Sequence, residues 1–103
     1  MIHVLAIITA KPGKRAEILD AFHDNIPAVL AEKGCIEYQP VIDADNAGDI
    51  QTALGSDSFT VIEKWATMDD LGAHATSAHM AAYAAKVKDL ISDRTIHILT
   101  NTQ

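Results

Sequence analysis

The sequence FTVIEKW at residues 59–65 has the period-two pattern of a β-strand. Side chains alternate across a strand, so Glu63 shares one face with Phe59, Val61 and Trp65. This face is otherwise apolar, which predicts that the strand packs on a hydrophobic core. A carboxylate in the middle of such a face needs either a polar partner or a chemical function.

We place this strand at residues 58–66. Hydrophobic periodicity in the rest of the chain predicts three further strands, at 2–10, 35–42 and 94–100. It also predicts helices at 14–32, at 68–75 and beyond Ser77. Pro27 lies inside the first helix and predicts a kink or a new turn there. Gly34 is expected to end that helix, and Thr67 is a good N-cap for the next one. Thr76 and Ser77 can cap the last helix.

This order of elements, βαββαβ, is typical of the ferredoxin-like α+β fold, a four-stranded antiparallel sheet with its helices on one face. The 103 residues fit one domain, residues 1–103. Strands 2–10 and 94–100 are apolar on both faces, so the face without helices needs a cover. We expect a second copy of the chain to supply it, in a homodimer packed sheet against sheet through the open face.

Composition excludes several classes of protein. The formal net charge is −6 and the basic residues are scattered, which disfavours nucleic-acid binding and attraction to an anionic membrane. Cys35 is the only cysteine, so an internal disulfide is impossible and a reducing cytoplasm is the simplest location. No apolar stretch approaches the ~20 residues that span a bilayer. The N-terminal segment also lacks the basic region and cleavage site of a signal peptide.

Glu63, His74 and His79 are the candidates for proton transfer. Burial on an apolar face is expected to raise the pKa of Glu63 toward a useful range. The five-residue spacing of His74 and His79 does not place them on one helix face, but a helix break between them could still bring them together. We favour His79 as the base. The structural alternative is a buried hydrogen bond or ion pair for Glu63 and a helix-break role for the histidines.

A metal site is not predicted. A zinc site would need a third ligand of suitable geometry, and the chain has no HxH, HExxH or CxxC motif. Cys35 is predicted to be a small buried side chain.

The chain resembles the antibiotic biosynthesis monooxygenase domain, and within it the quinol monooxygenases. The resemblance is carried by Gly34-Cys35-Ile36-Glu37-Tyr38, Phe59-x-x-x-Glu63-Lys64-Trp65, Leu71-x-x-His74 and His79. It implies a dimeric α+β barrel that oxidises a small aromatic quinol with O2 and without a cofactor, with Glu63 or His79 as base. The haem-degrading branch has an asparagine near the end of the first strand, and residues 4–8 here contain none.

Four aromatic residues are expected to bind the substrate: Trp65, Tyr38, Phe59 and Tyr83. Ordinary core packing is the alternative for each of them. Two other functions stay open at this level, an isomerase of a small carbonyl compound that uses the same acid and base, and a non-catalytic dimeric module that binds a small molecule. The polar segment 43–57 is unusually long for a hairpin loop, and the sequence does not decide whether it closes over a ligand.

Overall fold

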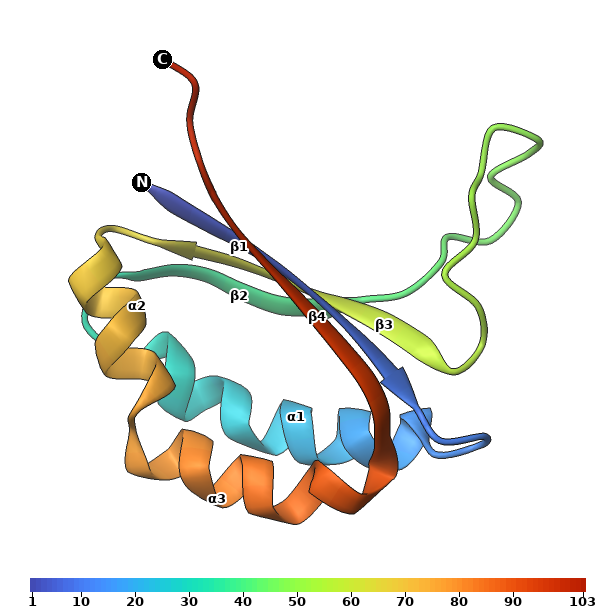
Figure 1. Cartoon of the computed structure of the whole chain (residues 1–103), viewed down its shortest axis with the longest axis horizontal. Coiled ribbons are helices and arrows are strands. Elements are labelled where there is room, and N and C mark those ends of the chain that lie inside the picture. Colours follow the sequence, from blue (N-terminus) through green and yellow to red (C-terminus); the bar gives the residue numbers. More distant parts are fainter.

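The computed structural model describes all 103 residues as a four-stranded antiparallel sheet with helices on one side (Figure 1). The strand order is β2-β3-β1-β4, which is the ferredoxin-like order. The elements are β1 (Ile2–Ala10), α1 (Arg15–Leu30), β2 (Cys35–Val41), β3 (Ser58–Trp65), α2 (Met68–Ala75), α3 (Ala78–Val87), the 3-10 turn η1 (Lys88–Leu90) and β4 (Ile91–Thr100). The predicted fold class is confirmed, with the second helical region divided to give βαββααβ.

Two hydroxyl caps divide that region. Thr67 Oγ1 accepts a hydrogen bond from the Asp70 amide at 3.1 Å, which starts α2 as predicted. Ser77 Oγ accepts one from the Met80 amide at 3.4 Å and starts α3. The backbone of Ser77 is extended, with φ −68° and ψ 153°, so α2 and α3 cannot continue as one helix.

Two boundaries differ from the prediction by more than one residue. Helix α1 continues through Pro27 but ends at Leu30, with Ala31 as its C-cap, rather than at residue 32 before Gly34. Strand β4 begins at Ile91 rather than at Arg94, because Ile91 pairs with Ala10 of β1 across an irregularity in the register.

The core lies between the sheet and the helices. Its largest fully buried side chains include Trp65, Phe22 and Phe59. Phe22 of α1 stacks on Tyr38 of β2 with ring centroids 5.0 Å apart and meets Phe59 edge-on at 6.0 Å. The face of β3 that carries Glu63 is therefore the face that packs against the helices.

The other face of the sheet has no cover within the chain. Leu5 of β1 is 36% exposed and Leu99 of β4 is 43% exposed, and Ile7 and Ile62 lie on the same face. Lys64 makes this face partly polar at one end. An apolar strip along the middle of an otherwise solvated sheet is the surface on which the dimer prediction depends.

The loop between β2 and β3 projects away from the body of the molecule (Figure 1). It leaves the end of β2 at Val41 and re-enters at Ser58, whereas α2 follows the opposite end of β3. No helix in the structure has the length and apolar character required to cross a membrane.

Candidate functional site

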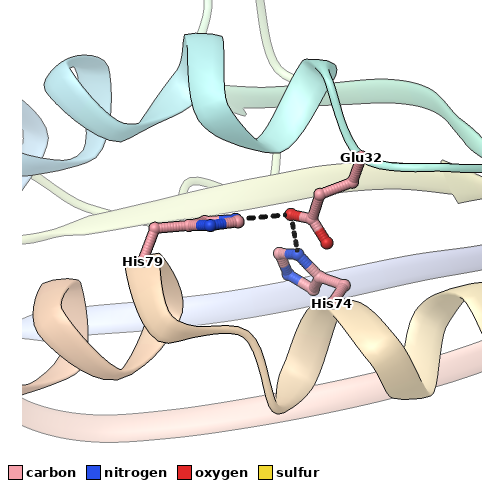
Figure 2. A group of neighbouring side chains, drawn as sticks. All are labelled: Glu32, His74 and His79. Atoms are coloured by element: carbon pink, nitrogen blue, oxygen red, sulfur yellow. Dashed lines mark hydrogen bonds and ion pairs between the residues drawn. The ribbon is translucent and has the colours of Figure 1, made fainter.

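A carboxylate and two imidazoles converge beside the end of β3 (Figure 2). Glu32 Oε2 lies 2.8 Å from His74 Nδ1 and 2.8 Å from His79 Nε2, so one oxygen holds both rings. The Glu32 side chain is 13% exposed, that of His74 is 5% exposed and that of His79 is 30% exposed. The cluster therefore runs from the buried core at His74 to the surface at His79.

The break between the two short helices makes this convergence possible. His74 is in the last turn of α2 and His79 is in the first turn of α3, and the extended residue Ser77 turns the chain between them. The helix break that could bring the two histidines together is present, and both rings contact the same Glu32 oxygen. Glu32 was not predicted as a site residue, since 42 residues separate it from His74 along the chain.

Glu32 is placed by the turn that joins α1 to β2. Gly34 in this turn has φ +79°, and its carbonyl oxygen accepts a hydrogen bond from the Ala66 amide at 2.8 Å. A Cβ atom at Gly34 would clash with the Asp70 side chain and would lie only 2.7 Å from its Cβ, so both the backbone and the space require glycine. The turn thereby fixes Glu32 against the end of β3 and the start of α2.

Glu63 lies beneath this cluster and has a polar partner. Trp65 Nε1 donates a hydrogen bond to Glu63 Oε1 at 2.9 Å, and His74 Nε2 lies 3.9 Å from the same oxygen. The Trp65 and His74 rings are 4.7 Å apart. Burial raises the pKa of Glu63, and the Trp65 hydrogen bond and His74 oppose that shift. The acid on the apolar face is thus buried, partnered and shifted in the predicted direction.

The hydrogen bonds at His79 indicate its tautomer. The Ser77 hydroxyl donates to the His74 carbonyl oxygen at 2.8 Å, so toward His79 Nε2, 3.3 Å away, it can only accept. The Glu32 carboxylate is also an acceptor. Both neighbours of His79 Nε2 therefore require a proton on that nitrogen, which leaves Nδ1 of the neutral ring free to accept one.

The four predicted aromatic residues lie in the core around Phe22. Trp65 and Phe59 have no exposed surface and Tyr38 is 4% exposed, whereas Tyr83 is only half-buried. Tyr83 meets Phe22 edge-on at 5.9 Å, and burial raises its pKa to about 12. Phe22 at the centre of this cluster was not among the predicted substrate-binding residues.

Two shallow cavities reach this region, and Tyr83 borders both. One, of about 200 Å³, lies between α1 and α3 and is lined by His79, Asn25 and Lys86 among others. The other, of about 270 Å³, is largely apolar and is lined by residues such as Met80 and Arg94. Of the proton-transfer candidates, His79 lines the first of these two cavities, and His74 and Glu63 line neither.

The loop 43–57 is remote from this site. The cluster adjoins the end of the β2–β3 pair at Cys35 and Trp65, and the loop leaves the other end, roughly 20 Å along the strand.

Comparison with known proteins gives one consistent family. Residues 1–86 match the model of the antibiotic biosynthesis monooxygenase family. The chain is 38% identical over 101 residues to the protein named probable quinol monooxygenase YgiN of Escherichia coli K12, covering 96% of each chain. Solved structures of PA3566 from Pseudomonas aeruginosa and Rv0793 from Mycobacterium tuberculosis superpose with TM-scores of 0.82 and 0.80 at 22% and 21% identity. They cover 99% of this chain and 94% and 95% of their own chains, and at this identity they show the fold alone.

Proposed function

Because the chain belongs to the antibiotic biosynthesis monooxygenase family, we propose that it is a cofactor-independent monooxygenase that oxidises a small aromatic quinol with O2. The observation that carries the proposal is the free Nδ1 of His79. The His79 ring lines a cavity, and Glu32 contacts it through the other nitrogen, Nε2. A base at a cavity wall is what deprotonation of a phenol requires. The name of the Escherichia coli relative supports the choice of a quinol.

The reaction needs a base because the quinol anion, rather than the neutral quinol, is readily oxidised. His79 takes a phenolic proton, and the anion passes one electron to O2 to give a semiquinone and superoxide. These two radicals combine at a ring carbon to form a hydroperoxide. The proton that His79 took up completes the hydroperoxide. The same ring carbon then loses its hydrogen as a proton while the O–O bond breaks and the carbonyl forms, and the departing hydroxide takes up that proton and leaves as water. The substrate supplies the electrons, and the protein supplies the base and the orientation.

Each residue of the site has a separate role in this proposal. His79 is the catalytic base, and Glu32 is a positioning residue that holds the proton on Nε2 and stabilises the imidazolium that forms. His74 and Glu63 are buried side chains to which the proton can pass from His79. His74 contacts Glu32 through Nδ1, and its Nε2 lies near Glu63. Tyr83 is the predicted aromatic residue that a ligand reaches without displacing the core.

The test is oxygen uptake by chelator-treated protein over a set of hydroquinones and polycyclic phenols, with heat-denatured protein as the control for autoxidation. We expect protein-dependent uptake that falls by about 10²-fold or more in His79→Ala, the usual effect of losing a general base. His23→Ala is the matched control, because His23 is an exposed histidine on α1 outside the cluster, and it should retain full activity. Uptake that is equal in His79→Ala and the wild type would refute the assignment of the base.

The homodimer is a separate part of the proposal. The strip of Leu5, Ile7, Ile62 and Leu99 supplies an apolar centre, and the partner copy would present the same strip. Sedimentation should give a dimer for the wild type and a monomer for Leu5→Glu, because the substitution places a charge at the centre of the interface. His79→Ala lies on the helix side and should remain dimeric. A folded monomer of the wild type at micromolar concentration would contradict this part.

A further inference from the structure

We propose that Glu32, His74 and His79 form a binding site for one divalent transition-metal ion of the Zn²⁺ class. The inference goes beyond the oxygenase function and does not depend on it. It starts from the donor set, since two imidazole nitrogens and one carboxylate oxygen lie within 4.8 Å of one another (Figure 2). Two histidines and one acid are a common ligand set for catalytic zinc and for non-haem iron.

The distances fit an ion after small movements. Bonds of ~2.1 Å in a tetrahedral site separate neighbouring ligand atoms by roughly 3.4 Å. Glu32 Oε2 lies 2.8 Å from each ring nitrogen, and the two nitrogens are no more than 4.8 Å apart. Each side chain needs to shift by less than about 1 Å to reach that geometry. The two histidines are on separate short helices, so such a shift does not distort a continuous helix.

The charges around the cluster favour a cation. Glu32 and Glu63 are both largely buried, and neither forms an ion pair with a lysine or an arginine. The only cationic partners within 4.0 Å of these carboxylates are the two histidines, which carry a charge only when protonated. A divalent ion would compensate the negative charge that the protein leaves without a permanent cation.

Glu63 has the position of a supporting residue for such a site. When a histidine binds a metal through one nitrogen, the other usually donates to a carboxylate, which fixes the ring. His74 would bind through Nδ1, and its Nε2 faces Glu63 Oε1 at 3.9 Å. Glu63 Oε1 is itself oriented by the Trp65 indole. The arrangement of metal, histidine and carboxylate is thus already assembled, with a closing movement of about 1 Å needed to complete the last hydrogen bond.

Access for the ion comes from the side of His79, whose side chain is 30% exposed and is the most exposed of the three ligands. Solvent on that side can complete the coordination sphere. Metal binding and proton transfer would compete for the same ring, because a metal on Nε2 of His79 moves the proton to Nδ1, the nitrogen that acts as base. Binding of Zn²⁺ is therefore expected to inhibit the oxygenase, should the oxygenase function hold.

The test is calorimetric titration of metal-free wild-type protein with Zn²⁺, followed by Co²⁺ absorption spectra to report coordination. We expect saturation at one Zn²⁺ per chain and no saturable binding of Mg²⁺, which prefers oxygen ligands. Glu32→Gln and His79→Ala should each weaken Zn²⁺ binding by at least about tenfold. Glu63→Gln should weaken it by about 10- to 100-fold, the usual effect of changing a supporting residue.

His23→Ala is the control for adventitious binding to an exposed histidine and should leave the Zn²⁺ affinity unchanged. Circular dichroism of each variant confirms that the chain is folded, and His79, at the surface end of the cluster, is the ligand least needed for folding. Absence of saturable Zn²⁺ binding would overturn the proposal, and so would an affinity that is the same in Glu32→Gln, His79→Ala and the wild type. None of these readouts requires turnover, so failure of the oxygenase assay leaves the outcome unaffected.

Discussion

Replacing Glu32 with alanine should destabilise the protein more than its position at the end of a surface helix suggests. Glu32 Oε2 accepts hydrogen bonds from the rings of His74 and His79, and losing each bond costs a different free energy. His74 is 4% exposed, so its Nδ1–H would be left unpaired in the core at a cost of about 1–3 kcal/mol. His79 reaches solvent and keeps Ser77 as a neighbour, so its loss is about 0.5–1.5 kcal/mol.

Together these losses predict that Glu32→Ala lowers the free energy of unfolding by about 1.5–4.5 kcal/mol. Glu32→Gln should lower it by only about 1 kcal/mol, because the amide oxygen can still accept and only the charge assistance is lost. Equilibrium urea unfolding measures both values, at one protein concentration for all variants, since a dimer makes stability depend on concentration.

Glu17→Ala is the matched control for this experiment. Glu17 is a glutamate of α1 that is exposed and pairs only with Lys14, so the change should be within about 0.5 kcal/mol. A loss below about 1 kcal/mol for Glu32→Ala would refute the reasoning, because it would mean that water or another group satisfies His74 when the carboxylate is absent.

Three further changes test other parts of the structure. Gly34→Ala should lower the free energy of unfolding by more than the ~1 kcal/mol of an ordinary backbone strain, since φ is +79° and the new Cβ meets Asp70; urea unfolding close to the wild-type value would contradict this. Glu63→Gln should stay folded, because the amide oxygen can accept from Trp65. The folded-state pKa of Glu63 is raised, so the free energy of unfolding of the wild type falls as pH rises above the usual value of 4.5. This fall should be smaller in Glu63→Gln, and unfolding compared from pH 4 to pH 8 measures it. Burial and nearby acids raise the pKa of the Cys35 thiol, so iodoacetamide should alkylate it more slowly than free cysteine at pH 8; an equal rate would show an unperturbed thiol.

Local sequence patterns predicted the fold because each element is specified by near neighbours. The period of residues 59–65 predicted which face of β3 is buried, and the hydroxyl of Thr67 predicted where α2 begins. The start of β4 was predicted three residues late, because Ile91 is a strand residue only through its pairing with Ala10. A boundary that depends on a distant partner leaves no local pattern.

The candidate site also has one part that local sequence determines and another that tertiary packing determines. The sequence by itself determined that Glu63 lies on a buried apolar face and that a break separates His74 from His79, because strand period and helix caps are local. Only the tertiary structure decided that Glu32 joins them, since its hydrogen bonds to the two rings span 42 and 47 residues of chain. It also decided that the Trp65 indole donates a hydrogen bond to Glu63. Side-chain partners across such distances depend on how α1, β3 and the two short helices pack, and that packing is a property of the whole core.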